Sequence, residues 1–271
     1  FAAFLAALVP VAAAATEDDT PTELTKLLTA YDAQGWEAVG RLNIGPGGMC
    51  TGALIAPNIV LTAAHCAYAK RTGRITDPRD VVFHAGYRNG RATASRQVSR
   101  ILVHPKYVHT GTVASSNVAV DLALFELKSD IRLPNVAPFD TGTRPRKGQQ
   151  VGVVSYAHDR AENPSLQEVC HVLARQRGSL VLSCSVDFGS SGAPIFTYDE
   201  GQPRIVSVVS AKAEIRGRDV SLGTNLEKPL AELMLLLKAG GGQLASPEIN
   251  IRRASQPRRV SSGNGAKFVR P

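Results

Sequence analysis

Aromatic side chains are scarce in this chain of 271 residues, and metal-binding motifs are lacking. Phe, Trp and Tyr make up 6% of the residues, with one Trp, whereas Gly occurs 24 times and Pro 16 times. This composition is typical of a globular protein with many short strands and turns. The chain contains no C-x-x-C and no H-E-x-x-H motif. We therefore expect no zinc site and no cofactor.

Long apolar runs are also lacking, with one exception at the N-terminus. Residues 1–15 read FAAFLAALVPVAAAA and turn polar at Thr16. The run resembles the h-region and cleavage site of a Sec-type signal peptide, although an initiator Met and a basic n-region are missing. A buried core helix is the alternative. No second run of about 18 apolar residues follows, so we expect no membrane contact once the signal is removed. The expected location is secreted or periplasmic.

Positive charge is concentrated at the C-terminus. The net charge is +8, and after Ala239 six basic residues stand against Glu248 alone, so five of the eight charges lie in this tail. A nucleic-acid-binding fold needs a basic stripe on its own surface together with a matching motif. Neither is present, so we expect no nucleic-acid partner. The polar residues 240–271 are predicted to be a disordered basic tail.

The pattern of the remaining chain predicts strands in two series. Residues 16–35 carry no strand pattern and are a pro-segment or an N-terminal arm. Strands are predicted over 38–44, 51–57, 58–64, 81–87, 96–104 and 121–127, and then over 149–157, 166–175, 179–186, 193–198 and 204–213. The Pro- and Gly-rich residues 134–148 separate the two series, and Arg177-Gly178 is a hairpin tip. One long helix is predicted from about 226 to 238, with Thr224 and Glu227 as a capping box.

Three short motifs occur in the order His, Asp, Ser. His65 ends the segment CTGALIAPNIVLTAAHC (50–66), Asp121 begins DLALFEL (121–127), and Ser191 lies in DFGSSGAPIF (187–196). Each motif alone carries little information, but three suitable contexts in one order are specific. Together they resemble the chymotrypsin-like serine proteases, especially the bacterial trypsin-like and V8-like branch.

The resemblance implies an all-β fold of two antiparallel six-stranded β-barrels with a C-terminal α-helix, and an active site between the barrels. Residues 36–135 would form the N-terminal barrel, and residues 136–239 the C-terminal barrel plus helix. His65 would be the general base, Asp121 would orient it, and Ser191 would be the nucleophile. The amides of Gly189 and Ser191 would form the oxyanion hole. Ser190 adjoins Ser191, but the family motif G-x-S-G-x-P selects Ser191.

The four cysteines form two pairs, which an exported protein can oxidise. Three connectivities are possible. We expect Cys50–Cys66 and Cys170–Cys184 because each would link neighbouring strands, and the first matches the family disulfide that flanks the histidine.

The chain departs from animal trypsins beside the nucleophile. Those enzymes carry Asp immediately before the serine, and after activation cleavage this Asp pairs with a new N-terminal Ile or Val. Here the position is Ser190, and no IVGG-like sequence precedes Trp36. We therefore predict that maturation does not depend on that buried ion pair.

Substrate preference is read from positions relative to Ser191. The position that forms the pocket floor in trypsin relatives is Ser185, which is neutral, and Ser210 matches the substrate-binding strand. Val209 replaces the His of glutamate-specific members, and Lys212 falls near the pocket entrance. We expect cleavage after small or medium uncharged residues.

The leading hypothesis is a monomeric serine endopeptidase that acts on proteins or peptides. Two other classes fit the same motifs: a catalytically weak or inactive protease-fold binding or regulatory protein, and an esterase that uses the same triad.

Overall fold

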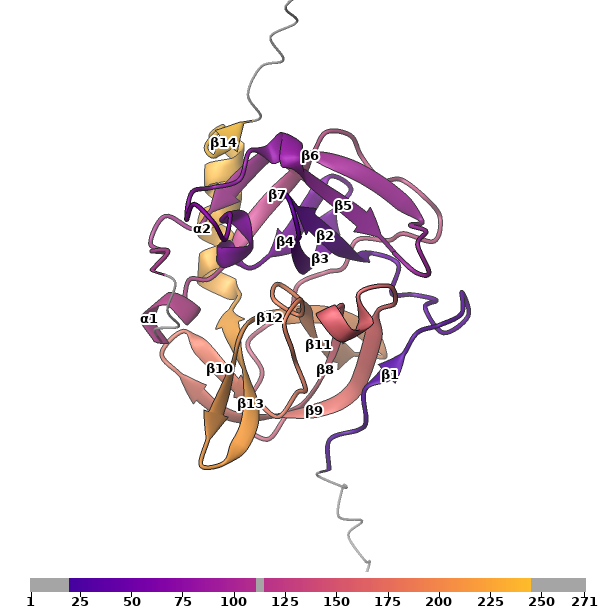
Figure 1. Cartoon of the computed structure of the whole chain (residues 1–271). Coiled ribbons are helices and arrows are strands. Elements are labelled where there is room, and N and C mark those ends of the chain that lie inside the picture. The colour runs from indigo at the N-terminus through magenta and orange to yellow at the C-terminus, as the bar shows by residue number, and fades with distance from the viewer. Residues whose placement is uncertain (1–19, 111–114, 245–271) are drawn as a thin grey trace, which may run out of the picture.

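The computed structural model describes residues 20–110 and 115–244, and two β-barrels stacked on each other make up most of it (Figure 1). The predicted signal peptide, the first residues of the N-terminal segment and the tail from residue 245 onward lie outside the described residues. No described helix has the length and apolar character needed to cross a membrane.

The N-terminal barrel consists of six antiparallel strands. They are β2 (Val39–Ile44), β3 (Gly48–Ala56), β4 (Ile59–Thr62), β5 (Val81–Ala85), β6 (Ala94–Val103) and β7 (Ala123–Leu127). The long strand β6 closes this barrel because it changes partner along its length: residues 94–97 pair with β5, and residues 98–103 pair with β7. Buried apolar side chains from all six strands fill the interior.

The C-terminal barrel repeats this arrangement. Its strands are β8 (Gln150–Ser155), β9 (Ser165–Gln176), β10 (Ser179–Leu182), β11 (Pro194–Asp199), β12 (Gln202–Ile215) and β13 (Arg218–Asn225). The long strand β9 closes this barrel by pairing with β8 through its first half and with β10 through its second half. Two closed six-stranded antiparallel barrels confirm the predicted fold class.

One barrel strand was absent from the sequence-based prediction. Strand β13 shows little apolar alternation, because small and polar residues occupy its buried positions: Ser221 and Thr224 are fully buried. At Gly223 a Cβ atom would lie 2.4 Å from Ser207 Oγ, so only glycine fits the close packing there. The predicted hairpin tip is confirmed, since Gly178 lies between β9 and β10 with a φ of 77°.

Two short strands extend the barrels and correct the expectations for the chain ends. Strand β1 (Thr25–Lys26) pairs with β9, although residues 16–35 showed no strand pattern. Strand β14 (Gln243–Leu244) pairs with β6, so the predicted disordered tail does not begin at residue 240. Both pairings depend on barrel strands with an open edge, and two residues are too few to show a periodicity.

The helices are few: α1 (Ser115–Val118), α2 (Glu227–Lys238) and the 3₁₀ turns η1 (Ala64–Ala67), η2 (Pro78–Asp80) and η3 (His158–Arg160) make up those of the described residues. The prediction of α2 is confirmed, but the capping box is wrong. The N-cap is Leu226 without a side-chain cap, and Glu227 instead accepts a hydrogen bond from Arg144 N at 3.2 Å. Although α2 follows the second barrel in sequence, Leu230 and Leu233 bury their side chains in the same core as the first barrel.

That core extends from the first barrel into part of the second, whereas the rest of the second barrel's interior forms a separate buried cluster that includes Val151 and Ile195. Val154, Phe196 and Val208 of the second barrel belong to the same buried cluster as the first barrel's interior. The shared core fixes the relative position of the barrels and of the segments where they meet.

Both expected disulfides are present, Cys50–Cys66 and Cys170–Cys184.

Candidate active site

Asp121 is a buried carboxylate that accepts three hydrogen bonds. It lies between α1 and β7, and 3% of its surface is exposed. Its Oδ1 accepts the backbone N–H of His65 at 2.9 Å, and its Oδ2 accepts from His65 Nδ1 at 2.7 Å and from Ser210 Oγ at 2.5 Å. A buried charge needs such donors to offset the loss of water. The side chain is therefore held as an acceptor aimed at the imidazole.

His65 is positioned by η1, a single 3₁₀ turn that follows strand β4. The preceding alanines Ala63 and Ala64 are fully buried, and Cys66 is joined to β3 by its disulfide. Because a carboxylate only accepts, Nδ1 must carry the proton in its hydrogen bond to Asp121, which leaves the Nε2 lone pair free when the ring is neutral. This is the tautomer that a general base requires.

The environment of His65 changes its basicity in two directions. Burial lowers the pKa of the imidazole, while the charge and hydrogen bond of Asp121 raise it, and the net result is a pKa above the ordinary value of 6.5. The charge and the hydrogen bond of Asp121, which both stabilise the imidazolium, together outweigh the effect of burial on the pKa.

Ser191 lies in a turn that packs against the first barrel. Its carbonyl oxygen accepts a hydrogen bond from Thr51 N at 2.9 Å, which connects the turn to β3. The next residue, Gly192, has a φ of 80°, and a Cβ there would lie 2.1 Å from Thr62 Oγ1 and 2.3 Å from Thr51 O. Only glycine fits between the turn and the strands β3 and β4. This close approach places the hydroxyl of Ser191 on the side of the second barrel that faces the first.

The backbone amides of Gly189 and Ser191 have no hydrogen-bond acceptor within the described residues. Among the hydrogen bonds of residues 20–110 and 115–244, neither N–H donates to a protein group. The carbonyl of Phe188 accepts from His158 N at 2.8 Å, and the carbonyl of Gly189 accepts from Thr51 Oγ1 at 3.0 Å. The carbonyl of Phe188 and the N–H of Gly189 belong to the same peptide group and point in opposite directions. The hydrogen bond from His158 to the Phe188 carbonyl therefore turns the Gly189 N–H away from His158. Two free donors on one tight turn can bind an anion.

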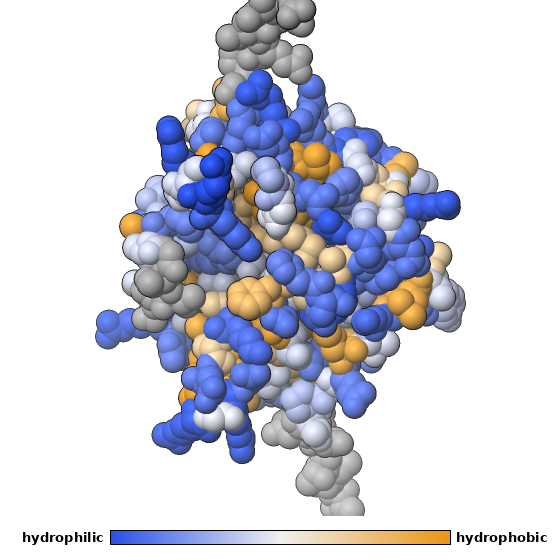
Figure 2. All heavy atoms as spheres, viewed as in Figure 1, coloured by the Kyte–Doolittle hydropathy of each residue, from blue (hydrophilic) through white to orange (hydrophobic). Residues whose placement is uncertain are grey.

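A cavity of about 350 Å³ brings together the predicted base, its carboxylate partner and the predicted nucleophile. His65, Asp121 and Ser191 all line it, although no direct hydrogen bond joins His65 to Ser191 in the described part of the chain. Its other walls combine apolar and charged side chains, among them Val186, Asp187, Phe188, Val209 and Lys212. Figure 2 shows mostly hydrophilic atoms over the face seen in Figure 1, with less polar residues gathered near its centre, where the barrels meet.

Three predicted substrate-binding residues occupy different places. Ser210 lines the cavity, but its hydroxyl donates to Asp121. Lys212 also lines the cavity, and its ammonium group pairs with Asp219 at 2.9 Å. Ser185 is not among the lining residues; it is exposed, and its N–H donates to Gln167.

An aromatic wall flanks His65 on one side of the cavity. The rings of Tyr68 and His109 stack with their centroids 4.3 Å apart, and the Tyr107 ring lies 5.9 Å from that of Tyr68. Burial and the nearby charge of Asp121 raise the pKa of Tyr107, so its phenol stays neutral. Such a wall suits the burial of apolar side chains.

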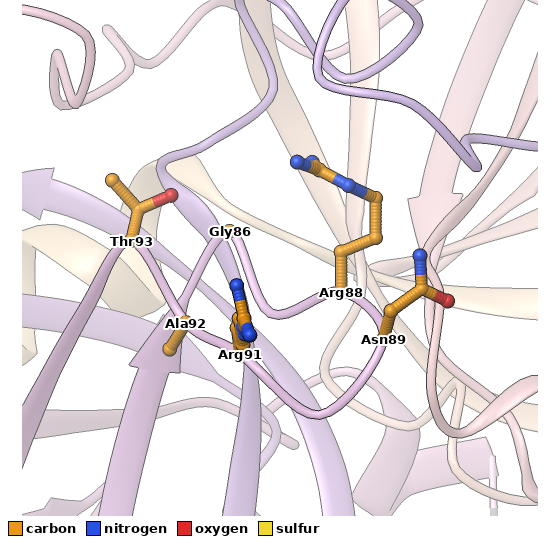
Figure 3. Close-up of a pocket in the computed structure, with 6 residues that line it drawn as sticks. All are labelled: Gly86, Arg88, Asn89, Arg91, Ala92 and Thr93. Atoms are coloured by element: carbon orange, nitrogen blue, oxygen red, sulfur yellow. The ribbon is translucent and has the colours of Figure 1, made fainter.

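A second hollow lacks the groups needed for acid–base or nucleophilic chemistry. It has a volume of about 430 Å³ and is lined by Gly86, Arg88, Asn89, Arg91, Ala92 and Thr93 in the β5–β6 turn (Figure 3). Its lining contains no carboxylate, imidazole or thiol from the described residues. The candidate site therefore remains the hollow between the barrels.

Within the described residues, one cluster has the spacing of metal ligands, namely Cys50, His65 and Cys66. Both sulfur atoms are joined in a disulfide, and a disulfide is not the thiolate that a metal requires. This cluster does not suit a metal ion.

Sequence reasoning missed two residues that support the site from a distance and gave a third a different role. Thr51 bonds to Gly189 and Tyr156, and Arg160 contacts Ser190. Nothing in the local sequence of Thr51 or Arg160 marks them, because Gly189 and Ser190 lie 138 and 30 residues away along the chain. Ser210 was predicted to bind substrate, but its hydroxyl holds Asp121, 89 residues away.

Comparisons with known proteins agree with this fold. The family profile described as Trypsin matches residues 29–220. Among solved structures, one described as a Glu endopeptidase in complex with MPD superposes with a TM-score of 0.65 at 20% identity, covering 80% of this chain and 96% of that one. A thermostable serine protease, AL20, from an extremophilic microorganism gives 0.61 at 15% identity, with 76% and 98% covered. A scabies mite inactivated protease paralogue, S-D1, gives 0.61 at 16% identity, with 78% and 96% covered.

Proposed function

Since this chain belongs to the trypsin family of serine proteases, we propose that it is a serine endopeptidase that works through His65, Asp121 and Ser191. The observation that carries the proposal is the doubly hydrogen-bonded pair of His65 and Asp121, in the same cavity as Ser191. Nε2 of His65 would take the proton of Ser191 Oγ as the oxygen attacks the peptide carbonyl. It would then return that proton to the leaving amine, and water would hydrolyse the acyl-enzyme.

The oxyanion would be stabilised by the amides of Gly189 and Ser191. Within the described residues both N–H groups are free of protein partners, which is the state that binding of a developing negative charge requires. Gly189 has a φ of 101°, which other residues rarely adopt, and a Cβ at this position would lie 2.9 Å from the backbone Cα of Ala157, so the turn favours glycine here. No cofactor takes part in this mechanism.

We propose that the substrates are proteins or peptides cut after small or medium uncharged residues. Val186 and Val209 give the cavity apolar walls, and the charge of Lys212 is offset by Asp219. A cleavage profile from a peptide library dominated by Arg or Lys at the cleaved position would refute this preference.

Two disulfides and a trypsin-like domain fit an extracellular protein. We propose that the protein is secreted or periplasmic, and that it is a monomer in which residues 20–35 remain as an N-terminal arm. Leu27 and Ala33 of this arm are buried, and Thr25 pairs with Leu166 of β9. Removing the arm would therefore expose apolar surface.

The test combines labelling with two substrate types. A sulfonyl fluoride should modify Ser191, as shown by peptide mass mapping, and casein should be hydrolysed. Failure of labelling and of all hydrolysis would favour an inactive protease-fold binding or regulatory protein. The scabies mite paralogue, described as an inactivated protease, has a similar fold. Hydrolysis of short-chain esters without hydrolysis of casein would favour an esterase.

A further inference from the structure

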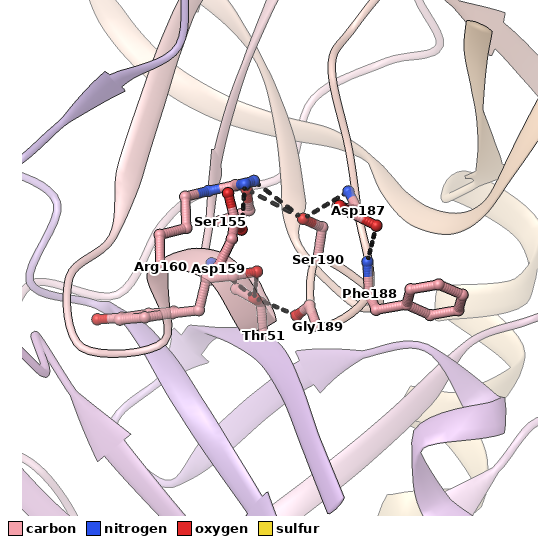
Figure 4. A network of polar contacts seen from close by, with 9 residues as sticks. Thr51, Ser155, Asp159, Arg160, Asp187, Phe188, Gly189 and Ser190 are labelled. Atoms are coloured by element: carbon pink, nitrogen blue, oxygen red, sulfur yellow. Dashed lines mark hydrogen bonds and ion pairs between the residues drawn. The ribbon is translucent and has the colours of Figure 1, made fainter.

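The turn that carries Ser191 is held by a buried arginine that does not line the cavity. Arg160 ends η3, and 4% of its side chain is exposed. Its Nη2 donates to Ser190 Oγ at 3.2 Å and to Ser155 Oγ at 3.1 Å, and its Nη1 donates to Asp159 at 3.1 Å (Figure 4).

Ser190 links this guanidinium to the backbone of the turn. The residue is fully buried, and its Oγ also accepts the N–H of Asp187 at 3.3 Å. The N–H of Ser190 in turn donates to the carbonyl of Asp187 at 2.9 Å. The hydroxyl and the main chain of Ser190 thus close the turn over Gly189, between the two free amides.

The positive charge of Arg160 also interacts with a carboxylate of the turn, Asp187. A buried cation is costly unless negative groups surround it. Burial lowers the pKa of Arg160, while the carboxylates of Asp159 and Asp187 oppose that change. Asp187 belongs to the turn itself, so the attraction between these charges pulls the turn toward η3. The carbonyl of Phe188 is drawn the same way by its hydrogen bond from His158, the first residue of η3.

We propose that Arg160 is a positioning residue that, through Ser190 and Asp187, holds the amides of Gly189 and Ser191 in the orientation that binds the oxyanion. This inference rests on the proposed function. In animal trypsins the corresponding support needs an aspartate and a newly cleaved N-terminus. Here the cation comes from the chain interior and its acceptor is the hydroxyl of Ser190, so the turn is formed without cleavage. The N-terminal arm is correspondingly engaged elsewhere, along β9.

The experiment compares Arg160→Met, Arg160→Lys and Ser190→Ala with wild type. Arg144→Met is the matched control, because the Arg144 guanidinium likewise donates to two protein acceptors, the backbone carbonyls of Gln176 and Ser179, but does not contact the turn. For each folded variant, kcat and KM are measured with a chromogenic peptide, together with the affinity for a peptide boronic acid and the melting temperature.

We expect Arg160→Met to lower kcat by about 10²-fold with a KM change below about threefold, since loss of one oxyanion donor costs about 10²–10³-fold in turnover. Boronate affinity should fall in parallel, and Arg160→Lys should recover part of the loss. Ser190→Ala, which removes one hydroxyl and should fold, is expected to lower kcat about tenfold. Arg144→Met should lower the melting temperature and leave kcat, KM and boronate affinity unchanged.

The inference would be overturned, and the proposed function left intact, if folded Arg160→Met had the same kcat and boronate affinity as wild type. If Arg160→Met does not fold, unchanged values in Ser190→Ala would have the same consequence. A wild-type protein that neither hydrolyses peptides nor reacts at Ser191 would instead refute the proposed function, and the inference with it.

Discussion

Ser210 and Asp121, 89 residues apart in the sequence, share a hydrogen bond of 2.5 Å in which the serine hydroxyl donates to the same oxygen that binds His65. The bond joins β12 of the second barrel to the segment before β7 of the first. It holds in place the same carboxylate oxygen, Oδ2, that accepts from His65 Nδ1. The relative position of the barrels therefore sets the orientation of His65.

Ser210→Ala should lower kcat/KM about tenfold, because a hydrogen bond to a charged group contributes about 1.5–3 kcal/mol and part of it is replaced by water. Ser207→Ala is the matched control. Ser207 lies on the same strand, is fully buried and donates to Thr224 O at 2.7 Å, but does not touch Asp121. Equal kcat/KM losses in the two variants would show that Ser210 contributes stability alone.

The activity should depend on the protonation of His65. Its pKa lies above 6.5, and the neutral imidazole is the base, so kcat/KM should rise with pH through a midpoint above 6.5. Asp121→Asn removes the charge that raises this pKa, and it should lower both the midpoint and, by about 10⁴-fold, kcat. A wild-type midpoint at or below 6.5 in a profile from about pH 5 to 9 would contradict the described ion pair.

The Cys50–Cys66 disulfide should contribute to stability and to activity. It closes a loop with a sequence separation of 16, for which loop entropy gives about 3 kcal/mol. In the double variant Cys50→Ser/Cys66→Ser, the free energy of unfolding measured in urea should fall by about this amount. The kcat should fall as well, because η1, which carries His65, is no longer fastened to β3. Removal of Cys170–Cys184, which has a sequence separation of 14, should lower the free energy of unfolding by a similar amount but should lower kcat less than removal of Cys50–Cys66 does. The prediction fails if both double variants lose kcat equally.

His104 should make stability sensitive to acid. It is 1% exposed, and burial lowers its pKa below 6.5, with Lys106 acting in the same direction and Glu232 opposing. Nδ1 accepts the N–H of Lys106 at 3.3 Å, as only the neutral ring does. A lowered folded pKa means that this stability is complete above pH 6.5 and is lost as the pH falls below that value toward the folded pKa.

The measurement for His104 is the free energy of unfolding in urea at about pH 7.5 and at about pH 5, on either side of the ordinary histidine pKa. His104→Asn keeps an acceptor near Lys106 N but does not titrate in this range. Wild type should lose more stability between the two pH values than His104→Asn. Equal losses would show that His104 is not buried as a neutral ring.

The sequence predicted the parts of the fold that local patterns encode. Alternating apolar residues located eleven of the twelve barrel strands, and the Thr-Ala-Ala-His-Cys context marked the turn of His65. The missed strand β13 packs glycine, serine and threonine inward, so its burial depends on neighbours such as Ser207 and not on its own hydrophobicity.

The supporting residues of the site were beyond prediction for a related reason. Arg160 has the local sequence of a charged loop, and its burial depends on Ser155 and Ser190 from other parts of the second barrel. Ser185 occupies the pocket-floor position by counting from Ser191, but it is exposed, does not line the cavity and donates its N–H to Gln167. Counting along the chain fails wherever tertiary contacts set the loop path.

The central claim is that Ser191 is a nucleophile activated by His65. The most direct test is the rate of p-nitrophenyl peptide ester hydrolysis, with acyl-enzyme detected by intact mass, in wild type and in Ser191→Ala. Wild type should show a burst and a mass increase of one acyl group on Ser191, and Ser191→Ala should show neither, with kcat reduced by about 10⁶-fold. Unchanged turnover in Ser191→Ala, or an acyl group on another residue, would contradict the account.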